Sequence, residues 1–246
     1  MNKLLIKIPT RERGLDWLDS YLDNITNPNT KILLTMDHDY DIELLDKMDF
    51  FKRDLLNPHI DRVLIEIGES KGKIEAINRD INKVIDDFDV LLVGSDDMIP
   101  QVKRFDQNIL DDMKANYPDG DGCLWYHTED HESVLKDRYK RTITAGSKEF
   151  YQKWICMLPV MGKAYYKRFN YVYHPSYKSF WCDNEQTAVA NRLGKITYLH
   201  KGIIKHVHPA WDQNGVDDEL YSRNNINWGH DQNNFRKRQS RGFPIN

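Results

Sequence analysis

The first hundred residues alternate between short apolar runs and amphipathic segments. Four apolar runs have the length and composition of buried β-strands, and they occupy residues 3–8, 31–36, 62–67 and 89–93. The segments between them space their apolar residues as amphipathic helices do, at residues 14–25, 41–51 and 73–85. This βαβα order predicts an α/β fold with a mostly parallel sheet flanked by helices. Such sheets bind ligands at the carboxyl ends of their strands.

Composition and charge exclude several classes of protein. The 246 residues are 40% hydrophobic, enough for a sizeable core, and the formal net charge of −3 gives no field typical of nucleic-acid or membrane binding. The three cysteines show no Cys-x-x-Cys spacing, so neither a disulfide framework nor a zinc knuckle is expected. The first apolar run breaks at Pro9, and no run is long enough to span a bilayer. We therefore expect a cytoplasmic protein without a signal peptide or membrane-spanning segment.

Nucleotide-binding motifs narrow the choice further. The chain has no G-x-G-x-x-G after the first strand and no G-x-x-x-x-G-K-[ST], so dinucleotide oxidoreductases and P-loop enzymes lack their main signature. A sugar-nucleotide synthesising enzyme would carry a glycine-rich loop at the first strand exit, where this chain reads IPTRERG. These three classes are therefore disfavoured.

The predicted strand at 89–93 leads directly into Ser95, Asp96 and Asp97. These residues could form a polar turn, since Ser and Asp side chains bond to nearby backbone amides. They could instead form a metal site, because paired carboxylate oxygens bind hard divalent cations. This stretch alone leaves both interpretations open.

Several stretches occur in an order typical of one enzyme family. They are KIPTRER at 7–13, an aspartate at the end of the second strand, SKGKIEAINRDI at 70–81 and LLVGSDD at 91–97. This set resembles the nucleotide-binding half of family 2 glycosyltransferases, which have the Rossmann-like GT-A fold. Residues 180–209 resemble the acceptor-side segment of that family, in which an acidic motif begins a helix and a histidine follows a later strand. The abundance of Lys, Asp and Asn is also similar to that of phage-encoded glycosyltransferases.

The resemblance covers roughly residues 3–209 and has consequences for domain organisation. It implies a single GT-A domain over residues 1–210. Residues 1–100 would be the nucleotide-sugar-binding half and residues 101–210 a less regular acceptor half. A C-terminal extension follows at 211–246, and no internal repeat or low-complexity linker divides the chain.

The resemblance also assigns residues to the donor nucleotide. Pro9, Thr10 and Arg11 would line the nucleotide pocket, and Asp37 or Asp39 would hydrogen-bond the base or the ribose. Plainer interpretations remain open, because Thr10 could cap a helix and the two aspartates could be solvated loop residues.

Further donor contacts are implied by the two later stretches. Lys73 would assist the diphosphate, Asn78 would contact the nucleotide, and Asp96 would reach the ribose or a metal-bound water. A lysine before a helix and an asparagine within one are also commonly just solvated.

A divalent cation is the cofactor that the resemblance implies, Mn²⁺ or Mg²⁺, with Asp97 as its first ligand. Gly94 departs from the family pattern, since another aspartate often stands there. His206 and His208 are two residues apart, so on an extended strand both point to the same face and could add ligands. Imidazole ligands would favour manganese over magnesium. The alternative is a pair of half-buried or surface histidines.

A base for the transfer is implied within CDNEQ at 182–186. Asp183 aligns with the family's catalytic carboxylate and Glu185 stands beside it, while Cys182 replaces a frequent acidic residue. Asp183 could also cap the following helix, and one residue can do both, because a helix N-terminus favours an ionised carboxylate.

These assignments together predict a metal-dependent, inverting glycosyltransferase. The donor would be a nucleotide-diphosphate sugar, with UDP as the expected nucleotide, and the acceptor a hydroxyl on a saccharide or surface polymer. One alternative is a phage-type DNA glycosyltransferase that modifies hydroxymethylated pyrimidines. Another is a non-catalytic module that binds nucleotide-sugars or nucleic acid.

Overall fold

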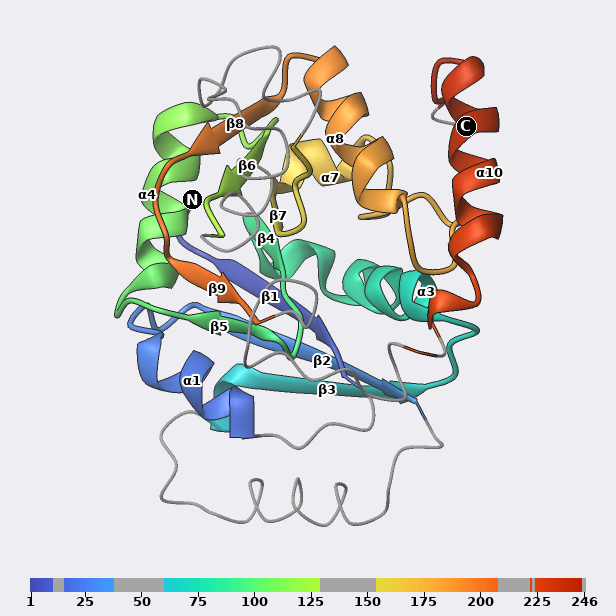
Figure 1. Ribbon diagram of the computed structural model, residues 1–246. Helices are drawn as coiled ribbons and strands as arrows, with labels where there is room; N and C mark the ends of the chain where they lie inside the picture. The colour runs from blue at the N-terminus through green and yellow to red at the C-terminus, as the bar shows by residue number, and fades with distance from the viewer. Residues whose placement is uncertain (11–15, 38–59, 129–153, 208–221, 223, 245–246) are drawn as a thin grey trace.

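The computed structural model describes residues 1–10, 16–37, 60–128, 154–207, 222 and 224–244 (Figure 1). The helix predicted at 41–51, and the predicted site residues Arg11, Asp39 and His208, lie outside the described residues. Within the described ranges, no helix combines the length and the apolar character that crossing a membrane would require.

A seven-stranded sheet forms the centre of the molecule, in the order β3-β2-β1-β4-β7-β6-β8. The strands are β1 (Leu4–Pro9), β2 (Lys31–Asp37), β3 (Val63–Gly68), β4 (Val90–Val93), β6 (Cys123–Tyr126), β7 (Pro159–Gly162) and β8 (Ile196–Leu199). The β3-β2-β1-β4 half is parallel, β7 is antiparallel to both of its neighbours, and β8 is parallel to β6. The predicted mostly parallel sheet is therefore confirmed, with every strand except β7 ending at the same edge.

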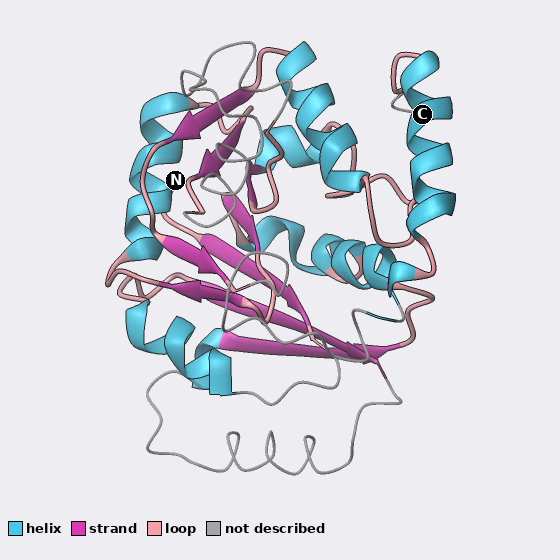
Figure 2. Ribbon diagram, viewed as in Figure 1, coloured by secondary structure: helices cyan, strands magenta, loops and turns pink. Residues whose placement is uncertain are grey.

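Helices cover both faces of this sheet (Figure 2). The helical segments are α1 (Asp16–Asn24), η1 (Ile60–Arg62), α3 (Lys73–Asn78), η2 (Ile81–Asp87), α4 (Phe105–Asn116), α7 (Lys163–Lys167), α8 (Cys182–Arg192) and α10 (Trp228–Ser240). Side chains alternate along each strand, so Ile6 joins the core shared with α1 and α4 while Leu5 joins the core shared with α3, α7 and α8. The sheet is thus packed against an apolar core on each face, which holds the strands and therefore the edge at which they end.

The helix predicted over 73–85 is interrupted, and this prediction is wrong at Arg79 and Asp80. α3 ends at Asn78, Arg79 is extended, Asp80 has a left-handed backbone with φ of 73°, and the 3-10 helix η2 follows. The interruption turns both side chains toward the end of β2. Asp80 Oδ2 accepts from Thr35 Oγ1 at 2.9 Å, and Arg79 Nη2 donates to the Met36 carbonyl at 2.7 Å. Tertiary contacts at the sheet edge therefore override the local helical pattern.

A small antiparallel sheet joins two distant parts of the chain beside this edge. It consists of β5 (Met98–Pro100) and β9 (Ile204–His206), with Met98 paired to His206. Because β5 starts immediately after the Ser95-Asp96-Asp97 turn, this pairing brings β9 against the end of β4.

Candidate active site

The turn after β4 has features of both interpretations of its sequence. Ser95 Oγ donates to Asp96 Oδ1 at 3.3 Å, and the Met98 amide donates to the Ser95 carbonyl at 3.1 Å, so a polar turn is present. Asp96 and Asp97 are nonetheless half-buried rather than fully solvated. The turn therefore holds two carboxylates at the carboxyl edge of the parallel strands.

Asp97 and His206 lie together at this edge. Asp97 Oδ2 is 3.5 Å from His206 Nε2, and the Val207 amide donates to the Asp97 carbonyl at 2.8 Å, which fixes β9 against the turn. A cation with bonds of about 2.1 Å can bind both atoms at this separation. Among the described residues, no group of three or more potential ligands occurs. Within the described residues the pair therefore supplies two ligand atoms for a cation, and phosphate oxygens and water are further ligands of the kind that Mg²⁺ commonly takes.

The structure explains why glycine, not aspartate, stands at position 94. A Cβ built on Gly94 would lie 2.9 Å from the Tyr21 hydroxyl and 3.3 Å from Ile8 Cγ1. Tyr21 is fully buried in the core beneath the turn, and burial together with Asp97 and Asp96 raises the pKa of its phenol. The space that an aspartate side chain at position 94 would need is thus occupied by the neutral phenol of Tyr21, from α1.

Gly94→Ala is expected to lower the free energy of unfolding by about 1–3 kcal/mol, because the added methyl group overpacks the contact with Tyr21. Tyr21→Phe removes the hydroxyl that the methyl group would meet, so the double variant should lose less than the sum of the two single changes. Urea unfolding of all four proteins measures this coupling. Strictly additive losses would show that Tyr21 does not restrict position 94.

The exits of β1 and β2 hold the residues predicted for the nucleotide. Pro9 pairs with Thr35, and the Thr10 amide donates to the Thr35 carbonyl at 3.1 Å. The Thr10 hydroxyl is buried and has no hydrogen-bond partner within the described part of the chain. Asp37 ends β2, where its Oδ1 lies 3.3 Å from Arg79 Nη1. These side chains thus lie at the same edge as Asp97.

A buried ionic network supports the exit of β2, and sequence analysis missed it. Lys7 is fully buried in β1 and donates to Thr35 Oγ1, which in turn donates to Asp80. Burial lowers the pKa of Lys7 to about 7, although Asp80 opposes that shift. Lys83 Nζ also contacts Asp80 Oδ1 at 2.9 Å. A lysine within an apolar strand run was the available signal, since a buried lysine requires a partner.

α3 places its two predicted residues differently. Lys73 is the first residue of α3 and is exposed. The carboxamide of Asn78 hydrogen-bonds to the main chain. Its Oδ1 accepts from the Val172 and Tyr173 amides, and its Nδ2 donates to the Tyr173 carbonyl at 2.7 Å. Asn78 therefore ties α3 to the 172–173 segment, and we do not retain it as a nucleotide contact.

Asp183 lies in the first turn of α8, close to Lys73 and His206. Burial raises the pKa of its carboxyl, while the Asn184 amide, 2.9 Å from Oδ1, and the charges of Lys73 and His206 act in the opposite direction. The residue in the N-cap position is Trp181, so the interpretation of Asp183 as the helix cap is wrong. Asp97 and His206 thus lie side by side, and Asp183 lies within electrostatic range of His206 and of Lys73.

Glu185 has a different environment from Asp183. Two residues apart on a helix correspond to about 200° of rotation, so the two carboxylates leave opposite faces of α8. Glu185 accepts from Arg238 Nε and Nη2, both at 2.8 Å, and from the Tyr177 hydroxyl at 2.7 Å. A buried carboxylate in a bidentate ion pair is a poor base, which argues against a catalytic role for Glu185.

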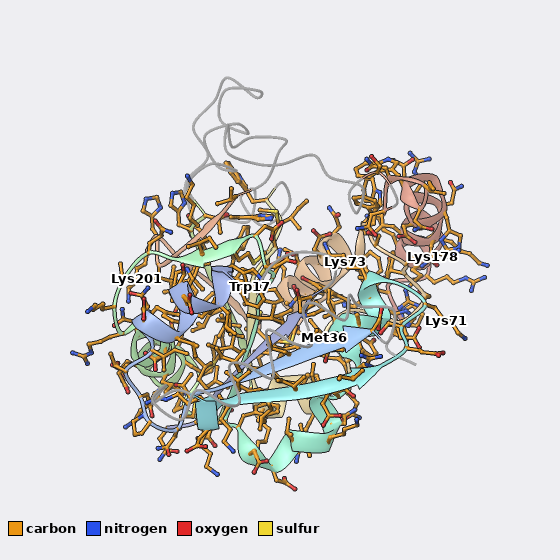
Figure 3. The ribbon with its side chains drawn as sticks, turned by 90° about the horizontal axis from the view of Figure 1, so that it is seen from below. Trp17, Met36, Lys71, Lys73, Lys178 and Lys201 are labelled. Carbon is orange, nitrogen blue, oxygen red and sulfur yellow. The ribbon has the colours of Figure 1, made fainter. Side chains whose placement is uncertain are left out.

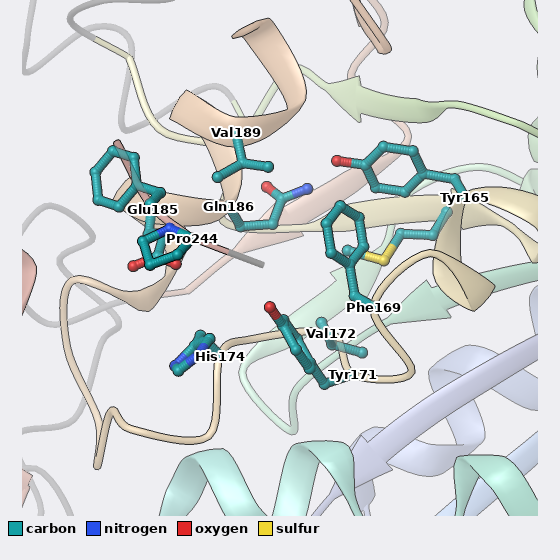
Figure 4. Close-up of a pocket in the computed structure, with 11 residues that line it drawn as sticks. Tyr165, Phe169, Tyr171, Val172, His174, Glu185, Gln186, Val189 and Pro244 are labelled. Carbon is teal, nitrogen blue, oxygen red and sulfur yellow. The ribbon is translucent and has the colours of Figure 1, made fainter. Parts of the chain in front are cut away.

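Glu185 borders a pocket between α8 and the segment that follows α7 (Figure 4). The pocket encloses about 360 Å³, part of it open to solvent. It is lined by Met161, Tyr165, Phe169, Tyr171, Val172, His174, Glu185, Gln186, Val189, Phe243 and Pro244. Glu185 is thus the predicted site residue that lines this pocket, whereas Asp97, Asp183 and His206 do not line it.

Comparison with known proteins supports the fold independently of sequence. No family model matches the chain, and no curated protein matches it. Among solved structures, it is similar to S. aureus TarS in complex with UDP-GlcNAc, with a TM-score of 0.59 and 15% identity over 89% of this chain and 61% of TarS 1-349. It is also similar to the mannosyltransferase PcManGT from Pyrobaculum calidifontis in complex with GDP-Man and Mn²⁺, with a TM-score of 0.58 and 10% identity over 84% and 57% of the two chains.

A third similar structure is GalNAc-T7 with UDP, GalNAc and Mn²⁺, with a TM-score of 0.59 and 13% identity over 100% of this chain and 52% of that one. The chain has the GT-A fold. The predicted Rossmann-like GT-A architecture is therefore confirmed. The chain spans about three fifths of the length of the first two structures.

Proposed function

We propose that this GT-A chain is a metal-dependent, inverting glycosyltransferase that uses a nucleotide-diphosphate sugar. The observation that carries the proposal is the Asp97–His206 pair at the carboxyl edge of the sheet, with the Asp183 carboxyl within electrostatic range of His206 and of Lys73. The structures of similar fold hold UDP, UDP-GlcNAc or GDP-Man, two of them with Mn²⁺. Ligand class, fold and site chemistry therefore agree.

In the proposed complex, the exits of β1 and β2 bind the nucleoside. Pro9 and Thr10 line the pocket, with Arg11 following them in the chain, and the buried Thr10 hydroxyl supplies a hydrogen bond. Asp37 binds the base or ribose, held in place by Arg79. UDP remains the expected nucleotide.

The diphosphate lies between Lys73 and the Asp97–His206 pair. A Mn²⁺ or Mg²⁺ ion bound there would neutralise charge on the diphosphate leaving group. Mn²⁺ is the proposed ion, because an imidazole ligand suits a transition metal. Asp96 reaches the ribose or a metal-bound water. Lys73, the first residue of α3, adds positive charge within electrostatic range of Asp183.

Asp183 acts as the base that removes the proton of the acceptor hydroxyl. Burial raises its pKa, which increases the basicity of the carboxylate, and Lys73 and His206 keep it from rising further. Because Glu185 is bound to Arg238 on the other face of α8, Asp183 is the carboxylate of α8 that we assign as the single base of an inverting displacement.

The acceptor is a hydroxyl on a saccharide or surface polymer. The alternative DNA acceptor is disfavoured by the net charge of −3, since affinity for DNA comes largely from neutralising phosphates with basic residues. A cytoplasmic location remains a prediction from the sequence.

The proposal is tested by thermal shift with UDP- and GDP-sugars, each with and without Mn²⁺. A donor at 100 times its Kd should raise the melting temperature by roughly 5–10 °C, and more with Mn²⁺ than without it. Release of UDP or GDP from the donor that binds would then separate an enzyme from a binding module. If no nucleotide-sugar shifts the melting temperature, the proposed function is wrong.

A further inference from the structure

Asp231 of α10 is a buried carboxylate that anchors a loop in another part of the chain. Its side chain is fully buried, and its oxygens accept from three successive backbone amides, those of Lys178, Ser179 and Phe180, at 3.1, 2.8 and 2.9 Å. His230 Nδ1 lies 2.9 Å from Asp231 Oδ1. A buried carboxylate would be costly without such donors, and charge-assisted hydrogen bonds are stronger than neutral ones. The 178–180 loop is therefore held firmly by α10.

The beginning of this loop contacts the start of α3. The Lys178 carbonyl accepts from the Ile74 amide at 3.4 Å, and a Cβ on Gly72 would lie 3.3 Å from the same carbonyl oxygen. Figure 3 shows Lys71 and Lys178 toward the side of the molecule that α10 occupies, with Lys73 nearer the centre. The position of Lys73 thus depends on the position of Lys178.

The end of this loop leads directly into α8. Trp181 has a left-handed backbone with φ of 63°, a conformation that is costly for a bulky residue and persists only when its surroundings enforce it. Its ring packs against Trp228 and Phe235 of α10, with centroids 5.6 and 5.2 Å away. α10 therefore contacts both the 178–180 loop that precedes Trp181 and the Trp181 ring itself. α8 starts at the next residue, and Asp183 is two residues after Trp181.

We infer that Asp231 is a positioning residue that places Asp183 and Lys73 relative to each other through the 178–180 loop. The inference rests on the proposed function, in which Asp183 is the base and Lys73 faces the diphosphate. It also gives the C-terminal extension a role, since α10 supplies the carboxylate that orders the site without touching the reacting atoms.

Asp231→Asn tests the inference with a small change in size. An amide places N–H groups against the amides of the loop, so the loop loosens while the apolar contacts of α10 remain. We expect kcat for transfer to fall on the order of 10²-fold, as for a displacement of about 1 Å at a reacting group. Amide hydrogen exchange, followed by mass spectrometry, should accelerate over residues 178–187 and 72–76.

Arg192→Ala is the matched control. Arg192 donates to the carbonyls of Gly242 and Phe243, which follow the end of α10 and are not part of the 178–180 loop. Its loss should lower stability while leaving kcat and the exchange of residues 178–187 unchanged. Asp231→Ala is a second test variant. Its kcat and its hydrogen exchange over residues 178–187 are compared with those of the wild type at a temperature at which both proteins are folded.

Two outcomes would overturn the inference: wild-type kcat in folded Asp231→Asn, or unchanged exchange across the loop. A purely structural Asp231 would lower the melting temperature without altering kcat of the folded protein. If the wild-type protein turns over no nucleotide-sugar, the proposed function fails instead. Hydrogen exchange at Ile74 and Asp183 then still decides whether Asp231 positions these two segments.

Discussion

Asp183→Asn is expected to lower the rate of sugar transfer by roughly 10²–10⁴-fold while leaving donor binding close to wild type. The amide keeps the shape of the side chain and the oxygen that accepts from Asn184, but it cannot take a proton from the acceptor. The predicted loss is the contribution that general-base catalysis typically makes. Steady-state transfer rates and donor affinity by calorimetry measure the two quantities separately.

The stability of this variant should not fall with its activity. Because burial raises the pKa of Asp183, the folded state binds its proton more tightly than the unfolded state does. The resulting stability is fully present below the unfolded pKa and is lost as the pH rises through the folded pKa. At pH 7 the ionised carboxylate therefore costs stability, and Asp183→Asn should melt at the same or a higher temperature than the wild type.

Asp87→Asn is the control for loss of one negative charge, since Asp87 is exposed at the end of η2. It should transfer sugar at the wild-type rate. In the wild type, the acid limb of the pH–rate profile should lie above the range of an ordinary aspartate, because the base must be ionised. Near-wild-type transfer by Asp183→Asn would exclude Asp183 as the base.

Local patterns predicted the parallel half of the sheet well. Its strands are nearly continuous apolar runs, as expected for strands buried on both faces, and the strand at 89–93 is observed as β4. Since parallel strands end at one edge, the sequence also predicted that the candidate residues Thr10, Asp37 and Asp97 lie at that edge. The break at Arg79 and Asp80 was not predictable in this way, because its cause is contact with β2 rather than local propensity.

Long-range pairings account for the rest of what the sequence did not show. Asp97 meets His206 through β5 and β9, which are too short to be recognised as partners before the fold is known. Asp231 lies in a polar helix with no motif around it, so nothing marked it as a buried anchor. The separation of Asp183 from Glu185, by contrast, follows from helix geometry and could have been predicted.

Asp97→Ala is expected to abolish the stimulation of transfer by Mn²⁺ and to weaken binding of the nucleotide when Mn²⁺ is present. Removing the carboxylate takes away the oxygen that lies 3.5 Å from His206 Nε2. Stabilisation of developing charge by a metal ion is worth several kcal/mol. We therefore expect the transfer rate in the presence of Mn²⁺ to fall on the order of 10³-fold. Asp97 is half-buried at a turn and lies outside the two hydrophobic cores, so the variant should remain folded.

His206→Ala should share the metal phenotype of Asp97→Ala in a milder form, because the carboxylate remains to hold the ion. Its affinity for Mn²⁺ should fall more than its melting temperature does. His200→Ala is the matched control, since His200 is exposed and stacks on His127 with ring centroids 4.8 Å apart. Titration with Mn²⁺ in the presence of UDP compares the four proteins. Identical titrations for wild type, Asp97→Ala and His206→Ala would show that the pair does not bind the metal.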